Sequence, residues 1–301
     1  MGYSLYYMIT SRCNLSCRYC FRDASKKSID NELSIDEMKA AIAKLYNDYG
    51  IRKLTISGGE PTFLKDSECR SFIEFINYVK KFKSNNSKDN LRVVLITNVV
   101  LMTEEVIEAI KGVVDRITVT VDAYDESILK TIGRNNKVYN SYLERSFSRM
   151  KLLSDAGFEI KLHSVVSPVN YNSLIDLAGY IKKRDDINIV RWKFFQYMGF
   201  GNEQVDKEFN ISDEKYWSLK PLIERELEGR NINIGFKSVA NQEESLFDLL
   251  PDGTFEYFVN ESGKLVRKHS KKLFCYKSWD ELFNECPINI ETFNKLHIYY
   301  N

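Results

Sequence analysis

The chain has 301 residues, of which 44% are hydrophobic and 28% are charged. That length allows one large domain or two small ones, and it can bury a core without a disulfide framework. The formal net charge is only +1, so general attraction to nucleic acid or to an anionic membrane is not expected. The N-terminus does not resemble a signal peptide and no apolar run has the length of a membrane span. We therefore expect a cytoplasmic protein with reduced cysteines.

Strand-like and helix-like patterns alternate along most of the chain. Strands are predicted at residues 3–10, 53–57, 91–97, 116–121, 158–166 and 189–195. Helices are predicted after the capping box that begins at Ser34, and at residues 67–83, 103–111, 140–156 and 171–184. Six such units, joined by right-handed crossovers, predict an α/β fold whose parallel sheet is curled into a partial barrel or left open.

The pattern weakens beyond about residue 230. Short strands, a turn at Pro251-Asp252-Gly253 and a final helix at residues 279–285 are expected there. We divide the chain into a barrel at residues 1–230 and a C-terminal extension at residues 231–301, which packs on the barrel as a lid or as its closure. The charged run from Lys264 to Lys272 is expected in a solvated surface turn.

Three cysteines follow the first predicted strand. Cys13, Cys17 and Cys20 have the spacing C-x3-C-x2-C. Three thiolates can bind three irons of a [4Fe–4S] cube, whereas an electron-transfer cluster normally has a fourth cysteine. The fourth iron is then open to a ligand that is not protein. An open position at a metal centre implies chemistry there, as it does for catalytic zinc.

A structural zinc site is the alternative interpretation of this cysteine motif. Three cysteines and a distant histidine can bind zinc, but zinc frameworks usually repeat a C-x2-4-C pair elsewhere in the chain. The remaining cysteines, Cys69, Cys275 and Cys286, form no such pair.

A glycine-rich turn follows the second predicted strand. It has the sequence Ser57-Gly58-Gly59-Glu60-Pro61. Functional loops of β/α folds follow the carboxyl ends of the strands, and paired glycines let the backbone approach a ligand closely. Glu60 is placed to accept a hydrogen bond from an ammonium group. The turn alone is a weak signal, but the three-cysteine loop one strand earlier makes it a strong one.

Four basic residues share one face of the predicted sheet. Side chains alternate along a strand, so Lys53, Lys161, Arg191 and Lys193 should point away from their apolar neighbours and into the barrel. Buried cations require anions, and phosphate suits arginine and lysine well. We therefore expect a phosphate-bearing ligand. The other interpretation places these residues at strand ends, where they reach water and pair with loop carboxylates.

The cysteine loop and the glycine turn together resemble those of the radical S-adenosylmethionine (radical SAM) superfamily. The resemblance implies a partial (β/α)6 barrel, in agreement with the six units, and a cluster whose open iron binds the amine and carboxylate of S-adenosylmethionine. It also implies that Gly58, Gly59, Glu60 and Pro61 contact the cofactor, and that Phe21 lies near its adenine. Reductive cleavage would give a 5′-deoxyadenosyl radical that abstracts hydrogen from the substrate.

Within that superfamily the chain resembles the viperin family over residues 3–282. The most specific matching segments are Cys13–Phe21, Lys53–Pro61, Asp125–Glu126, Ile132–Arg134, Lys161–Val165, Val190–Gln196 and Gly201–Glu203. The resemblance implies abstraction of the ribose 4′ hydrogen of a nucleoside triphosphate and loss of its 3′ hydroxyl. The product would be the 3′-deoxy-3′,4′-didehydro analogue, a chain terminator in antiviral defence.

The viperin resemblance also implies roles for individual residues. The triphosphate would be bound by Lys53, Lys161, Arg191 and Lys193. Arg134 would approach the cofactor carboxylate or the substrate, and Thr97, Asn98 and Thr120 would lie near the cofactor ribose. An electron donor is required as a partner, and the preferred nucleobase stays open.

The sequence departs from the animal viperin pattern in places, among them Arg22-Asp23, where those proteins have histidine and threonine, and two alternatives to the hypothesis stay open. Tyr6 stands where the animal proteins have asparagine, and Tyr257 is a candidate for late proton or electron transfer only by its position along the chain. A radical enzyme that modifies peptides is an alternative, although such enzymes usually carry further cysteine clusters, which Cys275 and Cys286 do not form. The second alternative is a metal-binding module without catalysis.

Overall fold

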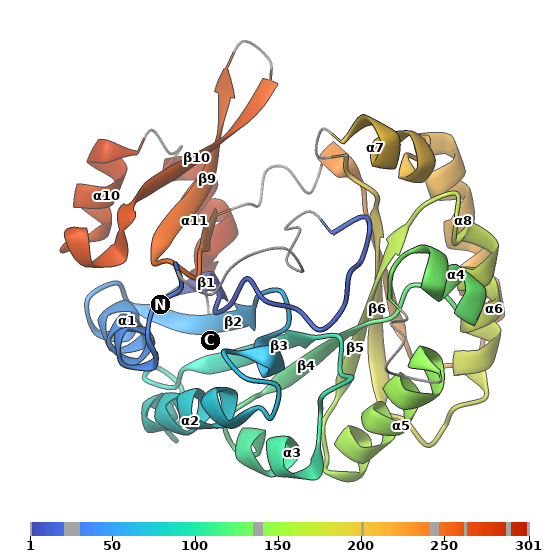
Figure 1. Cartoon of the computed structure of the whole chain (residues 1–301), viewed down its shortest axis with the longest axis horizontal. Coiled ribbons are helices and arrows are strands. Elements are labelled where there is room, and N and C mark those ends of the chain that lie inside the picture. Colours follow the sequence, from blue (N-terminus) through green and yellow to red (C-terminus); the bar gives the residue numbers. More distant parts are fainter. Residues whose placement is uncertain are drawn as a thin grey trace.

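A curved, open sheet organises the molecule (Figure 1). The computed structural model describes residues 2–20, 31–134, 141–199, 202–240, 247–261, 264–286 and 290–299. Seven strands run parallel in chain order: β1 (Gly2–Met8), β2 (Ile51–Ser57), β3 (Arg92–Thr97), β4 (Arg116–Thr120), β5 (Ile160–Val166), β6 (Ile189–Gln196) and β7 (Asn233–Lys237). The six predicted strands all form, within a few residues of their predicted ends.

Helices follow the outer side of this sheet (Figure 1). They are α1 (Ile35–Asn47), α2 (Arg70–Val79), α3 (Glu104–Ile110), α4 (Glu126–Thr131), α5 (Tyr142–Asp155), α6 (Tyr171–Lys182), α7 (Glu203–Phe209) and α8 (Asp213–Glu226). The predicted capping box is confirmed, since the Ser34 and Glu37 side chains each accept a hydrogen bond from the other residue's backbone N–H. Helices α4, α7 and α8 were not predicted.

Alternation along β5 and β6 separates the core from the concave face. Trp192 and Phe194 are fully buried against the helices, which contributes about 1.5–3 kcal/mol for each side chain. Lys161 and His163 on β5, and Lys193 on β6, alternate with such residues and are only half-buried. The prediction that the apolar residues pack on the helices is therefore confirmed, and the polar set faces the inner side.

The C-terminal residues extend the sheet at both of its edges. Strand β7 pairs with β6, while β8 (Phe247–Leu249) pairs with β1 and continues through β9 (Thr254–Glu261) to β10 (Lys264–Lys272). A short strand, β11 (Ile298–Tyr299), also pairs with β1. The chain after residue 230 thus adds to the same sheet, and its role as a lid stays a prediction.

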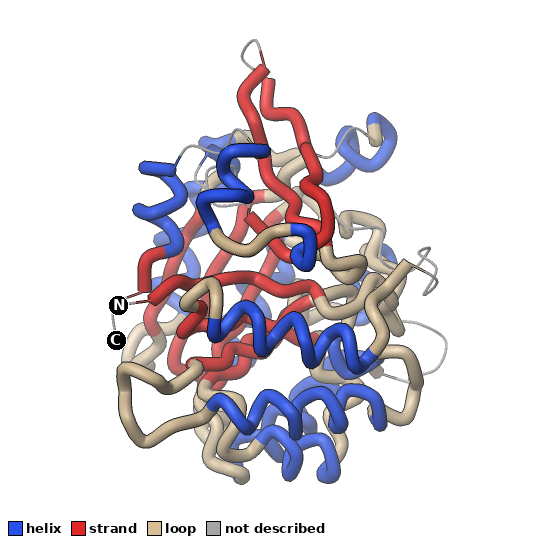
Figure 2. Tube along the Cα trace, turned by 90° about the vertical axis from the view of Figure 1, so that its left-hand side faces the viewer, coloured by secondary structure: helices blue, strands red, loops and turns tan. Residues whose placement is uncertain are grey.

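Strand β10 corrects one prediction. The charged run Lys264–Lys272 is a strand, not a solvated turn, because it pairs along its length with β9. Both views show the two strands as a hairpin that projects beyond the rest of the sheet (Figures 1 and 2). Arg267, His269 and Lys271 alternate as the more exposed side chains, so a charged run is compatible with a strand whose one face is solvated.

Aromatic packing fixes the C-terminal helices α10 (Trp279–Glu285) and α11 (Ile290–His297) against the first β/α unit. Trp279 packs edge to face on Tyr49, with ring centroids 4.8 Å apart, and its indole N–H donates to the Tyr49 carbonyl at 2.9 Å. The ring of Phe293 lies 5.0 Å from that of Trp279. Across the described residues, no helix is both long and apolar enough to span a membrane.

Candidate active site

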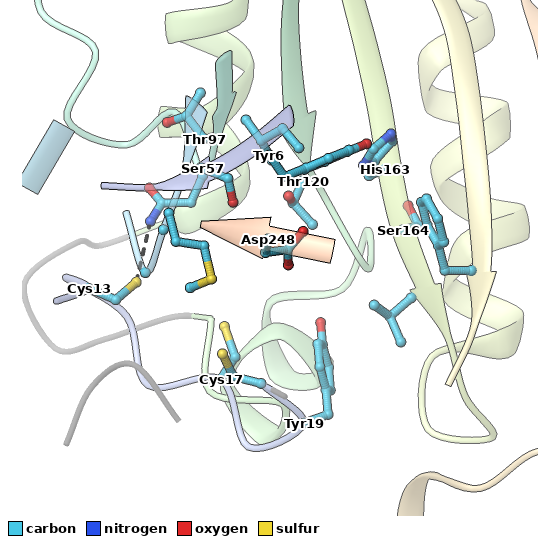
Figure 3. Close-up of a pocket in the computed structure, with 18 of the residues that line it drawn as sticks. Tyr6, Cys13, Cys17, Tyr19, Ser57, Thr97, Thr120, His163, Ser164 and Asp248 are labelled. Atoms are coloured by element: carbon cyan, nitrogen blue, oxygen red, sulfur yellow. Dashed lines mark hydrogen bonds between the residues drawn. The ribbon is translucent and has the colours of Figure 1, made fainter. Parts of the chain in front are cut away.

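A cavity of about 550 Å³ opens at the carboxyl ends of the parallel strands (Figure 3). Its size lies within the range of about 300–1,000 Å³ that is usual for small-molecule sites. The cysteine loop, the glycine turn and the inner faces of β1, β5 and β6 all contribute to its wall. The two motifs that the sequence singled out therefore meet in one place.

The three motif cysteines line this cavity as free thiols. The backbone N–H of Leu15 donates to Cys13 Sγ at 3.4 Å. Burial raises the pKa of Cys13 to about 12 and that of Cys17 to about 11. Bare thiolates are thus disfavoured in this site, and a bound metal centre would supply the positive charge that they lack.

Three thiols are the protein ligands that a [4Fe–4S] cube with one open iron requires. Each thiolate of such a cube binds a different iron, whereas the ligands of a zinc ion converge on one atom at about 2.3 Å. The chemistry of these three free thiols therefore fits a cluster with an open iron.

A buried polar network holds the cysteine loop against the barrel. Asp122 is fully buried and forms an ion pair with Arg134. Its carboxylate also accepts from the Tyr19 hydroxyl at 2.6 Å and from the Val165 N–H at 2.7 Å. Arg134 lines the cavity beside Cys17 and opposes the rise of that thiol's pKa. The predicted contact of Arg134 with cofactor or substrate stays a prediction, and its positive charge is matched by Asp122.

Gly133 permits the close approach of the cysteine loop. Its φ is +82°, and an added Cβ would lie 2.1 Å from the Ser16 carbonyl oxygen. The Ser16 N–H donates to the Gly133 carbonyl at 3.2 Å, and the Arg18 N–H donates to the Ile132 carbonyl at 2.9 Å. A side chain at position 133 would therefore separate the loop from α4.

Backbone hydrogen bonds also join the glycine turn to the cysteine loop. The Gly59 N–H donates to the Thr10 carbonyl and the Glu60 N–H to the Arg12 carbonyl, both at 2.8 Å. Gly58 is required at its position, since an added Cβ would lie 2.6 Å from the Thr10 oxygen. Gly58 and Gly59 line the cavity with their backbone.

The Glu60 side chain points into the protein instead of the cavity. It is fully buried and accepts from the hydroxyls of Thr62 and Thr97, at 2.6 and 2.7 Å, and from the Asn98 N–H at 2.6 Å. Burial raises the pKa of Glu60, and these donors oppose the rise. The carboxylate therefore ties the turn to the end of β3, and the expected contact with an ammonium group has no support from its position.

The remaining predicted cofactor residues divide into three groups. Thr97, Asn98 and Thr120 line the cavity, where the Asn98 amide lies 3.9 Å from Cys13 Sγ. Pro61 is buried and begins a short 3-10 helix, η2 (Pro61–Phe63). Phe21 lies outside the described residues, as does Gly201 of the last matching segment.

The four predicted cations lie near one another, since Arg191, Lys193 and Lys53 each lower the pKa of Lys161, and of the four Lys53 alone is among the described residues that line the cavity. Lys161 is paired in register with Arg191, and Lys53 lines the cavity wall. A Cβ built on Gly235 of β7 would lie 3.5 Å from Lys193 Cγ and 3.7 Å from Arg191 Nη2, so these two side chains pass the same backbone position.

Three of these cations have no ion-pair partner within the described chain. No carboxylate there forms an ion pair with Lys161, Arg191 or Lys193. The Arg191 Nε is buried and has no hydrogen-bond partner among the described atoms. Burial and the neighbouring cations lower the pKa of Lys161 to about 8 and also lower the pKa of Lys193. Such a site favours an anionic ligand.

Several further residues of the site were not predicted. Arg116 at the start of β4 adds to the repulsion on Lys161. Its position, two residues before Thr118, could have placed it on the same face of the strand from the sequence alone. Lys237 and Asp248 line the cavity from β7 and β8, strands whose pairing partners the sequence does not reveal. His297 also lines it, and its Nδ1 lies 2.9 Å from the Ser4 carbonyl oxygen. Tyr257 is buried and is not among the residues that line the cavity.

Three cysteines and a glycine turn at the carboxyl ends of the first two parallel strands are the residues that an iron–sulfur enzyme with an open iron would require. Residues 7–181, more than half of the chain, match the family model of the radical SAM superfamily. The chain belongs to this superfamily. Its cofactors are accordingly a [4Fe–4S] cluster and S-adenosylmethionine.

The curated relatives include GTP 3′,8-cyclases. The protein of that name from Staphylococcus epidermidis is 27% identical over 228 residues, which are 71% of this chain and 62% of the relative. The one from Staphylococcus aureus strain Mu50 is 28% identical over 202 residues, which are 65% of this chain and 54% of the relative. This chain thus spans less than two thirds of the length of these relatives.

Solved structures show the same fold. Streptococcus suis SuiB bound to S-adenosylmethionine has a TM-score of 0.64 at 14% identity, covering 85% of this chain and 60% of SuiB. anSMEcpe with bound AdoMet and the Kp18Cys peptide has a TM-score of 0.62 at 16% identity, covering 84% of this chain and 73% of anSMEcpe.

Proposed function

We propose that this radical SAM enzyme converts a ribonucleoside triphosphate to its 3′-deoxy-3′,4′-didehydro analogue, as the viperin resemblance implies. The observation that carries the proposal is the set of inward-facing cations. Lys161, Arg191 and Lys193 form no ion pair with a described carboxylate, and they lie on β5 and β6, whose residues His163, Val165 and Phe195 line the cavity that contains the cysteines. A polyphosphate would compensate their charge.

The cofactor site is assigned to the two loops at the cavity mouth. Cys13, Cys17 and Cys20 would hold three irons, and the backbone of Gly58 and Gly59 would contact the methionyl amine. The bound cluster and S-adenosylmethionine supply the carbon radical that removes a substrate hydrogen. The chain's own part is to hold this centre at one end of the cavity, through the network around Asp122.

The order of residues along the strands supports a substrate position between the cations and the cysteines. Lys161 precedes the cavity residues His163 and Val165 on β5, and Lys193 precedes Phe195 on β6. A nucleotide whose phosphates contact the lysines would therefore extend its ribose toward the carboxyl ends of the strands. That end of the barrel carries the cysteine loop.

The comparisons are compatible with a nucleotide substrate. The curated relatives are named for GTP, a nucleoside triphosphate. One solved neighbour was crystallised with a peptide. Peptide modification is also the alternative function that the sequence analysis left open. Cys275 is exposed and Cys286 buried, and the sequence contains no further group of closely spaced cysteines around them. Such groups would favour the peptide alternative.

The test compares phosphorylated and unphosphorylated ligands. Reconstituted protein is incubated anaerobically with S-adenosylmethionine, dithionite and each of the four ribonucleoside triphosphates, with the matching nucleosides as controls. We expect one triphosphate to raise 5′-deoxyadenosine formation at least about tenfold above its nucleoside, since each lost charge-assisted contact costs about 1.5–3 kcal/mol. The product should be the substrate less one water. A product of unchanged mass would instead favour a cyclisation, and no stimulation by any triphosphate would refute the proposal.

A further inference from the structure

His163 occupies the position between the cations and the cavity. It follows Lys161 by two residues on the inner face of β5 and is paired in register with Lys193. Its ring packs edge to face on Phe195, with centroids 4.8 Å apart. No described residue hydrogen-bonds to the imidazole, although it lines the cavity, so its nitrogen atoms are available to a ligand.

On the side of the cavity where His163 lies, the neighbouring charged residues are all cations. The neighbouring strands β4, β5 and β6 direct Arg116, Lys161, Arg191 and Lys193 to this face. Tyr6 and Asp248 face the cavity from the opposite side, and Figure 3 shows the Tyr6 side chain extending toward His163.

Because of burial and these cations, the imidazole is neutral in the ligand-free protein. Burial is the larger cause, and Lys193, Lys161 and Arg191 add to it, so that the pKa of His163 falls to about 3. A polyphosphate bound to the same cations would cancel their field at the imidazole. The basicity of His163 is therefore coupled to occupancy of the phosphate site.

We propose that His163 is a catalytic residue of this enzyme, which takes up a proton when the triphosphate binds and donates it to the departing 3′ hydroxyl. The proposal rests on the proposed function. It adds the group that carries out the acid step. Hydroxide is a poor leaving group, so loss of the 3′ oxygen requires a proton donor within reach.

After the 4′ hydrogen has left, the C3′–O bond breaks and the imidazolium proton of His163 passes to the oxygen, which leaves as water. The positive charge remains on the substrate as a radical cation. One electron from the external reductant then forms the neutral 3′,4′ double bond, and His163 regains a proton from solvent.

Other groups of the cavity are less suited to this step. Burial, followed by the charge of Asp248, raises the pKa of Tyr6, which weakens it as an acid. Lys161 and Lys193 would be engaged by phosphate. Of the chain's three histidines, His297 has its Nδ1 placed against the Ser4 carbonyl and His269 lies on β10.

The kinetic test separates hydrogen abstraction from dehydration. His163→Asn should retain triphosphate-dependent 5′-deoxyadenosine formation but yield at least about tenfold less dehydrated product per 5′-deoxyadenosine, the low end of a general acid's contribution. In the wild type this ratio should fall as pH rises above the pKa of His163 in the complex, whereas in His163→Asn it should not vary with pH. His269→Asn, which changes a histidine outside the cavity, should behave as wild type.

An unchanged ratio in His163→Asn would overturn the inference alone. Absence of any triphosphate effect in the wild type would overturn the proposed function and the inference with it.

A spectroscopic measurement tests the coupling without turnover. The three histidines of the oxidised holoenzyme can be followed by NMR during a pH titration, with His163 assigned from the His163→Asn variant. Inorganic tripolyphosphate should raise the pKa of His163 by more than two pH units. Binding of tripolyphosphate without such a rise would overturn the inference.

Discussion

Replacing Lys161 by Met should make the ligand-free protein more stable and its substrate binding weaker. Lys161 is half-buried among like charges, and no described carboxylate forms an ion pair with it. Methionine keeps most of the volume of the aliphatic chain and removes the charge. The two effects have opposite sign because the same repulsion that disfavours the folded protein prepares a site for a polyanion.

The magnitude follows from the pKa of the lysine. Burial, and then Arg116, Arg191 and Lys193, lowers the pKa of Lys161 from 10.5 to about 8. Keeping the amine charged in the folded protein therefore costs on the order of 1–3 kcal/mol, after an allowance for screening by water. The cost is fully present below pH 8, declines as pH rises from 8 to 10.5, and is absent above that range.

Thermal unfolding of the ligand-free protein under anaerobic conditions measures this effect. At pH 7 the midpoint of Lys161→Met should lie about 2–5 °C above that of the wild type, and the difference should shrink toward pH 10. Lys220→Met is the matched control, because Lys220 is exposed on α8 and its ion pair with Glu224 is worth little. Binding of the triphosphate should weaken about 10–150-fold in Lys161→Met. A lower midpoint than that of Lys220→Met at pH 7 would refute the reasoning.

Three further substitutions test the architecture of the cofactor site. Asp122→Asn leaves the charge of Arg134 buried and should lower the free energy of unfolding by about 3–5 kcal/mol in urea titrations, whereas a loss below ~1 kcal/mol would contradict the role of the pair. Gly133→Ala places a methyl group against the cysteine loop and should reduce bound iron well below the ~4 atoms of one cube, while Gly112→Ala, also left-handed but in open space, should retain it. Glu60→Gln presents an amide N–H to buried hydrogen-bond donors. It should lower the free energy of unfolding by about 1–3 kcal/mol and cause partial loss of iron. Full iron retention at wild-type stability would show that the carboxylate is dispensable.

Local patterns carried most of the information about the barrel. The period of two along β5 and β6 placed Lys161, Arg191 and Lys193 on one face, and the structure confirms that placement. The spacing of the cysteines and glycines placed two loops at the same end of the sheet, where they share a cavity. Such features depend on one strand or one turn at a time, so a single sequence suffices to predict them.

Features that depend on distant pairing were missed. Lys237, Asp248 and His297 reach the cavity only because residues after 230 pair with β6 and β1 or pack beside them, and nothing local indicates those partners. The donors that hold the Glu60 carboxylate could not be predicted either, since they come from η2 and from the end of β3. The charged composition of β10 concealed a strand, because a solvated edge tolerates lysine and arginine on its exposed face.

The most direct test of the central claim follows the 4′ hydrogen of the substrate. The triphosphate that stimulates the enzyme is prepared with deuterium at the ribose 4′ position and incubated anaerobically with the reconstituted protein, S-adenosylmethionine and reductant. Mass spectrometry should find one deuterium in 5′-deoxyadenosine and none in the dehydrated nucleotide. Unlabelled 5′-deoxyadenosine, formed at the same rate from the same triphosphate, would contradict the placement of the ribose between the cations and the cysteine loop.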